Sequence, residues 1–74
     1  MQINPVGLHE TEITQGNKLV LFSYKTPVAF IRNSVGYRTS QNWSKTTSRH
    51  INKFFARHPV VSITTIGQDL LDSF

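Results

Sequence analysis

The sequence contains no cysteine, so neither a disulfide nor a thiolate-bound metal can stabilise the chain. With 74 residues, the chain lies near the lower limit for a single hydrophobic core. It has no apolar run of about 18 residues and no signal-peptide pattern, which predicts a protein that is neither membrane-spanning nor exported. We therefore expect one domain over residues 1–74, in which residues 1–8 form an N-terminal arm.

Acidic residues are scarce and lie only near the two ends of the chain. Glu10 and Glu12 precede an acid-free stretch, residues 13–68, and Asp69 and Asp72 follow it. All eight basic residues fall inside this stretch, and the net charge is +4. A fold that gathers them on one side would attract phosphate or an acidic protein surface. The alternative is that these charges only solvate a small domain.

The first half of the chain has the residue pattern of an antiparallel meander. The predicted strands are residues 9–14, 18–24, 28–32 and 35–39. Gln15-Gly16-Asn17 and Asn33-Ser34 supply turns, and Pro27 suits the first position of a strand because it cannot donate to a ladder. The segment 18–24 is apolar on both faces, which is typical of a central strand.

Residues 46–58 have the period of an amphipathic helix. Ile51, Phe54 and Phe55 fall on one side, and we expect this side to be buried against the apolar strands. Pro59 ends the helix, because the residue before a proline disfavours helical dihedral angles.

Two groups of residues carry helix-capping chemistry. Ser44, Thr46 and Thr47 can all cap the start of the first helix through a side-chain oxygen, and we expect Thr46 or Thr47 to do so. Thr65, followed three residues later by Gln68, resembles a capping box that opens a second helix.

The C-terminal segment adds two short elements. Val60–Thr64 is β-branched and predicts a strand, and Ile66, Leu70, Leu71 and Phe74 form an apolar stripe on the terminal helix. We expect this stripe to pack on the domain's own core, with a homodimer or a partner helix as the alternative. The predicted fold class is therefore α+β, a three- to four-stranded antiparallel meander packed on one helix, followed by a short strand and a C-terminal helix.

Lys45, Arg49, Lys53 and Arg57 form a basic stripe of cations spaced four residues apart. The apolar side of the helix must face the core, so we expect the stripe to point outward. Like charges at this spacing destabilise a helix, and the central stretch has no acid to offset them, which suggests an external partner. The alternative is a solvated face built from good helix formers.

Aromatic residues near these cations are also candidates for binding. Single-strand binders combine aromatic rings with a basic groove, and Trp43, Tyr24 and Tyr37 are candidates for such stacking. In so small a chain we expect each to serve the core or cover a sheet edge instead. Trp43 is the most interesting, because it lies in a polar loop before the helix. The candidate binding residues are Lys45, Arg49, Lys53, Arg57, Arg38 and Trp43.

The sequence does not support catalysis or metal binding. His50 and His58 would lie about 12 Å apart along one helix, too far to share a metal ion. His50 beside Lys53 or Arg49 has groups suited to phosphodiester cleavage, but the acid-free stretch lacks a second base. There is no Gly-rich phosphate loop and no Gly-x-Ser-x-Gly motif. We therefore expect no enzymatic activity, metal or cofactor.

Residues 21–38 (LFSYKTPVAFIRNSVGYR) and 44–52 (SKTTSRHIN) resemble a family of small, uncharacterised proteins encoded by bacteriophages and plasmids. The shared motifs are a tyrosine and Thr-Pro-Val between two strands, a Tyr-Arg-Thr strand, and the Thr-Thr-Ser-Arg-His-Ile-Asn helix start. The resemblance covers residues 16–55 and brings no established activity or catalytic residue. It implies a viral or mobile-element protein that acts in the cytoplasm of a bacterial host.

Two functional hypotheses follow. In the first, the protein is an accessory factor whose basic helix binds the phosphate backbone of nucleic acid, with salt-sensitive affinity and little sequence preference. In the second, it is a protein-binding module or inhibitor that targets an acidic surface of a bacterial host protein. An aromatic anchor at Trp43 with apolar neighbours favours a protein partner, whereas a bare cationic face favours nucleic acid.

Overall fold

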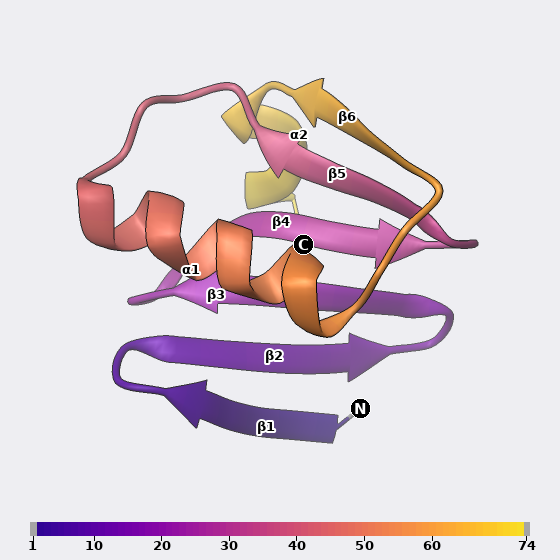
Figure 1. The fold of residues 1–74 in the computed structure, drawn as a ribbon, viewed down its shortest axis with the longest axis horizontal. Coiled ribbons are helices and arrows are strands. Elements are labelled where there is room, and N and C mark those ends of the chain that lie inside the picture. The colour runs from indigo at the N-terminus through magenta and orange to yellow at the C-terminus, as the bar shows by residue number, and fades with distance from the viewer. Residues whose placement is uncertain (1, 74) are drawn as a thin grey trace.

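The computed structural model describes residues 2–73, which form one six-stranded sheet with a helix on each face (Figure 1). Strand order follows chain order. The first five strands form an antiparallel meander, and the sixth pairs parallel with the fifth. A parallel pair needs a crossover connection, which the first helix provides. The elements are β1 (Gln2–Gly7), β2 (Glu10–Gln15), β3 (Lys18–Ser23), β4 (Thr26–Arg32), β5 (Val35–Thr39), α1 (Lys45–Arg57), β6 (Ser62–Ile66) and α2 (Gln68–Asp72).

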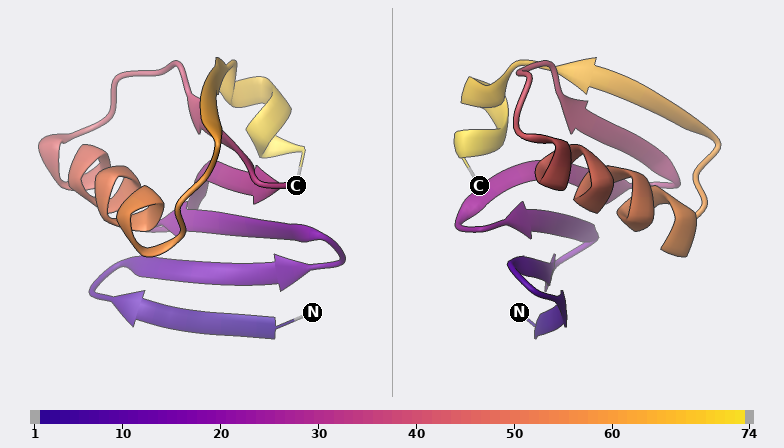
Figure 2. Two further views of the ribbon diagram at one scale, coloured as in Figure 1. Left: turned by 45° about the vertical axis from the view of Figure 1, so that its right-hand side comes forward. Right: turned by 60° about the vertical axis from the view of Figure 1, so that its left-hand side comes forward.

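The sheet has apolar residues on both faces, and each face contacts a different helix (Figure 2). Side chains alternate along β3, so that Leu21 faces α1 and Val20 faces α2. The core on the α1 side contains Leu21, Val28, Ala29, Ile51 and Phe54. The core on the α2 side contains Val20, Phe30 and Leu71. The predicted α+β class and the central position of β3 are confirmed.

The apolar side of α1 packs on the sheet as the sequence predicts. Ile51 and Phe54 are 1% and 0% exposed. Phe55 is half-buried and packs against the same core. Its ring lies over Gly36 in β5, where a side chain would collide with it. The helix therefore reaches across the sheet from β3 to β5.

The structure forms a strand from residues 2–7 of the predicted N-terminal arm, residues 1–8. β1 pairs antiparallel with β2, with Ile3 opposite Ile13 and Pro5 opposite Thr11. Proline and glycine disfavour strands, which hides this one in the sequence. Pro5 is tolerated because β1 lies at the edge of the sheet, where one side of the strand needs no ladder partner.

The predicted turns are confirmed, and several require unusual backbone angles. Gly16 has a φ of 61° in the turn between β2 and β3. Asn33 and Ser34 both have positive φ, 54° and 65°, as a two-residue type I′ hairpin requires. His9 and Tyr24 also have positive φ, 62° and 59°. These last two residues belong to turns at the same end of the sheet, because the β1–β2 and β3–β4 connections lie on one side.

Ser44 caps the start of α1, so the prediction that Thr46 or Thr47 does so is wrong. The Ser44 Oγ accepts a hydrogen bond of 3.3 Å from the Thr47 backbone N–H. The Thr47 side chain is buried and is hydrogen-bonded to Ser23 at 3.0 Å. The helix itself begins and ends one residue earlier than residues 46–58.

The C-terminal elements are also shifted relative to the prediction. β6 covers Ser62–Ile66 rather than Val60–Thr64, and Thr65 therefore extends the strand instead of capping a helix. Gly67 occupies the N-cap position of α2 and makes no side-chain cap. The Gln68 side chain bonds to Trp43, Asp72 and the Pro27 carbonyl.

The apolar stripe of the terminal segment is only partly used for packing. Leu71 is fully buried and Ile66 packs against the same core, as expected. Leu70 is 58% exposed, and Phe74 lies outside the described residues. A homodimer through this helix stays a prediction.

Candidate functional site

The four cations of the basic stripe all lie at exposed positions of α1, but two of them pair with acids of β2. The Lys53 Nζ lies 3.0 Å from Glu10 Oε2, and the Arg57 Nη2 lies 2.8 Å from Glu12 Oε2. The expectation that no acid offsets the stripe is therefore wrong for its C-terminal half. Because the acids are more than 40 residues away in the sequence, only the fold brings them together.

Both acids of β2 are buried against α1. Glu12, 4% exposed, accepts from Arg57 through Oε2 and lies 2.9 Å from His58 Nε2 through Oε1. Glu10 is 2% exposed and contacts Gly7, where a side chain would collide with its carboxylate. Within residues 2–73, the Glu10 Oε1 has no hydrogen-bond partner. These carboxylates hold the helix on β2 and leave little negative charge at the surface.

A buried polar network fixes the first half of α1 on β3. The His50 Nδ1 lies 2.8 Å from Ser23 Oγ, which in turn bonds to Thr47 Oγ1. Burial lowers the pKa of His50, although nearby Glu10 acts in the opposite direction. Ser23, His50 and Glu10 combine a hydroxyl, a base and an acid, and Ser23 is only 2% exposed. The network is a structural anchor for the helix.

The described residues contain no cluster of three or more His, Asp or Glu side chains that could hold a metal ion. The closest groupings are Glu10 with His50 and Glu12 with His58. A cation already occupies each of these carboxylates, Lys53 and Arg57 respectively.

Three exposed cations lie at the end of the sheet where α1 begins. Lys45 and Arg49 occupy the first half of α1, and Lys25 lies in the turn between β3 and β4. Within residues 2–73, none of the three forms an ion pair with a carboxylate. Within the stripe, the cations without an ion pair among the described residues are therefore Lys45 and Arg49, in its N-terminal half.

Two aromatic rings stack at the same end. His9 and Tyr24 have ring centroids 4.5 Å apart and an interplanar angle of 20°, and the Tyr24 N–H donates to the His9 carbonyl at 2.7 Å. The Tyr24 ring also lies 6.1 Å from the ring of His50, which places it beside α1. Tyr24 is 50% exposed, so the expectation that it serves the core is wrong. Tyr37, by contrast, is half-buried and stacks on Phe30.

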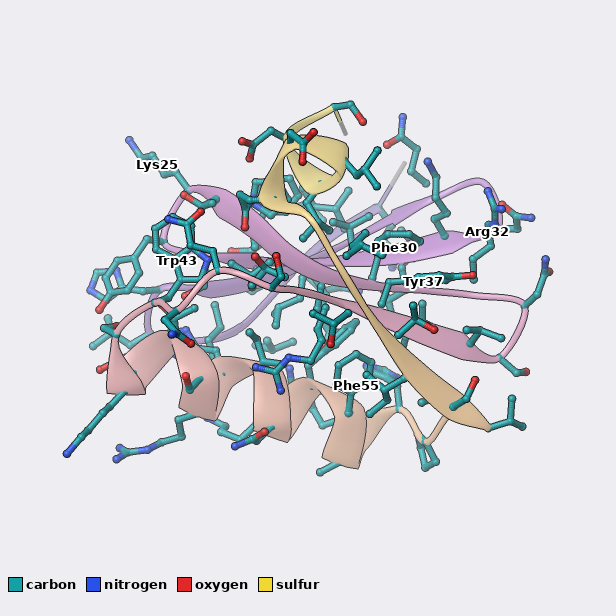
Figure 3. All side chains as sticks on the ribbon, turned by 90° about the horizontal axis from the view of Figure 1, so that it is seen from above. Lys25, Phe30, Arg32, Tyr37, Trp43 and Phe55 are labelled. Atoms are coloured by element: carbon teal, nitrogen blue, oxygen red, sulfur yellow. The ribbon has the colours of Figure 1, made fainter. Side chains whose placement is uncertain are left out.

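Trp43 is anchored through its indole ring. Its indole N–H donates to Gln68 Oε1 at 3.3 Å, and the Gln68 amide donates to the Pro27 carbonyl at the start of β4. Trp43 is 37% exposed, and Lys25 lies on the same side of the molecule, whereas Arg32 lies at the opposite side (Figure 3). The loop before α1 is therefore tied to the turn region that carries Lys25.

These features form one surface, which we call the loop-end surface. Its residues are His9, Tyr24, Lys25, Trp43, Lys45 and Arg49. It unites Lys45, Arg49 and Trp43 of the predicted site with Tyr24, which the sequence offers only as a stacking candidate, and with His9 and Lys25, which lie outside the predicted site. Histidine and tyrosine do not predict a positive φ, so the sequence gives no local signal for the stacked pair of His9 and Tyr24.

Three predicted site residues are not part of the loop-end surface as defined. Lys53 and Arg57 are paired with β2. Arg38 is half-buried on β5, and strand alternation directs it to the α1 face. The acids of α2, Asp69 and Asp72, are carried on the other face of the sheet (Figure 2).

The fold and this surface define a small α+β domain with exposed cations and aromatic rings at one end of its sheet. The family model of the Family of unknown function (DUF8033) matches residues 1–70, and the chain therefore belongs to that family. No curated protein and no solved structure matches the chain. Membership of an uncharacterised family is confirmed, and the match extends beyond residues 16–55 on both sides. No helix within residues 2–73 is long and apolar enough to cross a membrane.

Proposed function

We propose that this protein is a nucleic-acid-binding accessory factor that contacts phosphates through the cations of the loop-end surface. The observation that supports this function is the division of the basic stripe. Lys53 and Arg57 serve the fold through buried acids, whereas Lys45 and Arg49 are exposed and form no ion pair within residues 2–73. The charges of Lys45 and Arg49 therefore have no ion-pair role in the described part of the fold, and phosphate is a suitable counter-charge for them.

The exposed cations of the loop-end surface set the number of contacts. Lys25, Lys45 and Arg49 give about three phosphate contacts, which corresponds to a logarithmic salt slope of about −2.7 on duplex DNA and about −2.1 on a single strand. Such contacts position a protein but read no sequence. The proposed binding is therefore weak at high salt and tolerant of sequence.

The direct test measures the salt dependence of oligonucleotide binding. Arg49→Gln should lower the magnitude of the slope by about 0.9 on duplex or about 0.7 on a single strand, because one phosphate contact is lost. Arg32→Gln is the matched control, since it removes one exposed cation at the other side of the molecule (Figure 3). Circular dichroism checks that both variants fold. Absence of binding to duplex and single-stranded DNA and RNA at low salt would refute the proposal.

The resemblance to bacteriophage and plasmid proteins adds a cellular context to the proposal. In that context the protein acts in the cytoplasm of a bacterial host on the nucleic acid of the mobile element or the host. Purification of the tagged protein from expressing bacteria, with and without nuclease, tests this context. Nucleic acid that copurifies and is removed by nuclease is the expected result.

A protein partner is the second candidate function, and one observation favours it. A groove of about 310 Å³ lies against the α2 face of the sheet. Leu70, which is 58% exposed, lines it together with Tyr37 and Arg32. An apolar surface with an aromatic ring and an arginine is typical of protein interfaces. A host protein that stays bound after nuclease treatment and is lost in Leu70→Ser would support this function.

A further inference from the structure

The ring of Tyr24 is half exposed although it contacts the rings of His9 and His50. It is 50% exposed at the tip of the β3–β4 turn and stacks on His9, which is itself exposed. Aromatic rings of this size normally bury most of their surface in a domain. The stacked pair instead forms a platform that is open to solvent.

The backbone at this platform is strained. Tyr24 and His9 both adopt left-handed φ values, 59° and 62°. Glycine or asparagine adopts this conformation with less strain, and a bulky aromatic residue there is uncommon. Strained residues of this kind cluster at binding sites, where the surrounding structure holds a side chain in place for a ligand. Here the strain presents a ring to solvent beside Lys25.

We infer that the loop-end surface binds single-stranded nucleic acid, with an unpaired base stacked on Tyr24 and the phosphates along Lys25, Lys45 and Arg49. This inference rests on the proposed function and specifies its ligand. Every base has a flat face that stacks on an aromatic ring, and this stacking adds affinity without sequence preference. In a duplex these faces are covered by neighbouring base pairs, so the platform gains nothing from double-stranded ligands.

The arrangement of the other groups fits this ligand. The Tyr24 ring lies 6.1 Å from the ring of His50, the residue that follows Arg49 on α1, so the ring platform lies beside the helix that carries Arg49. The Trp43 ring, held through its N–H by Gln68, offers a second partly exposed aromatic surface. The alternation of aromatic and cationic side chains is what single-strand binders use to follow a backbone with splayed bases.

The test compares single-stranded oligothymidine, single-stranded oligouridine and a DNA duplex, using the fluorescence of Trp43, the only tryptophan. Either single strand should quench this fluorescence and bind more tightly than the duplex at the same salt concentration. A preference between oligothymidine and oligouridine would reflect the 2′-hydroxyl or the thymine methyl group, and equal affinity indicates that stacking and phosphate contacts dominate. Both outcomes support the inference, whereas tighter binding of the duplex overturns it.

The decisive variant is Tyr24→Asn, because asparagine accepts the left-handed backbone while it removes the ring. Single-strand affinity should fall about 5- to 140-fold, the range of one lost base–aromatic stack, and duplex affinity should stay within about twofold. Ser34→Asn is the matched control, since Ser34 also has positive φ, 65°, in the turn at the other end of β4. It should change neither affinity.

The possible failures are distinguishable. Tyr24→Asn could lower single-strand and duplex affinity by the same factor, or it could leave both unchanged. Either result overturns the stacking inference, and phosphate binding stands. If no nucleic acid binds to the unmodified protein at low salt, both the inference and the proposed function are overturned. Thermal unfolding of Tyr24→Asn should show unchanged or increased stability, which separates loss of binding from loss of fold.

Discussion

Arg57 donates two hydrogen bonds to a single carboxylate oxygen of Glu12, from Nε at 2.9 Å and Nη2 at 2.8 Å. The two residues lie 45 positions apart, one near the end of α1 and the other in the middle of β2. Glu12 is almost fully buried, and these donors and His58 supply the hydrogen-bond partners of its carboxylate. The pair therefore links the C-terminal half of α1 to the second strand of the sheet.

Glu12→Gln should destabilise the fold and strengthen nucleic-acid binding. Loss of the charged acceptor should lower the free energy of unfolding by about 1 to 3 kcal/mol. Arg57 is then released toward solvent, which adds one exposed cation to the stripe and should raise low-salt affinity for oligonucleotides. Urea denaturation and binding titrations measure the two effects. Unchanged stability would show that the ion pair contributes nothing in solution.

The sequence predicts the central elements well because their signals are local. The β-branched and apolar pattern of β3 to β5 and the helical period around Ile51 and Phe54 are each contained within a few residues. β1 was missed because its strand character comes from pairing with β2 and is opposed by Pro5. Here tertiary pairing overrides the local propensity of the residues.

The candidate site was predicted less completely, for the same physical reason. Lys45 and Lys53 are equivalent in the sequence, each four residues from another cation, yet only Lys53 meets a buried acid. That distinction depends on where β2 lies relative to α1, which no window of sequence contains. The Tyr24 platform likewise depends on a left-handed backbone and on contact with His9 from a different turn.

Stability should decrease as the pH falls below about 6.5, because His50 is buried in its neutral form. Burial lowers the pKa of His50 in the folded state, so the unfolded chain binds the proton more readily. The contribution of neutral His50 to the free energy of unfolding is complete above the pKa of His50 in the unfolded chain. It is lost as the pH falls toward the pKa of His50 in the folded protein. Glu10 raises the pKa of His50, and it is opposed by three groups that lower this pKa: Lys53, His9 and Arg49.

The measurement is urea denaturation from about pH 7.5 to about pH 5 for the unmodified protein and His50→Gln. The variant removes the titrating group, so the stability difference between the two proteins should change over this range. Parallel stability curves would mean that His50 has the same pKa in the folded and unfolded states.

Ser44→Ala should destabilise the start of α1. The Ser44 hydroxyl is the acceptor for the Thr47 backbone N–H, and its loss leaves that donor without its cap. The expected decrease in the free energy of unfolding is about 0.5 to 1 kcal/mol, since the bond is long for a cap. Thr46→Ala, at an exposed position in the same turn, should have a smaller effect. If Thr46→Ala destabilises the protein more than Ser44→Ala does, Thr46 rather than Ser44 is the cap.

Gly36→Ala should destabilise the contact between β5 and α1 because the new methyl group meets the Phe55 ring. A Cβ at residue 36 would lie 2.5 Å from Phe55 Cε1 and 3.1 Å from Cζ, so the ring must move out of its packed position. Such overpacking lowers the free energy of unfolding by about 1 to 3 kcal/mol. Phe55→Leu provides a smaller neighbour, and the double variant should lose less stability than the sum of the single variants.

Gly16→Ala separates this steric effect from a general effect of replacing glycine. At Gly16 no atom lies within 4 Å of an added Cβ, but the φ of 61° is unfavourable for alanine. Gly16→Ala should therefore also destabilise the protein, yet its effect should add to that of Phe55→Leu because the two sites share no contact. Chemical denaturation of the single and double variants gives the coupling energy of Phe55→Leu with Gly36→Ala and with Gly16→Ala. Additive behaviour of Gly36→Ala with Phe55→Leu would show that α1 does not rest on β5 through this ring.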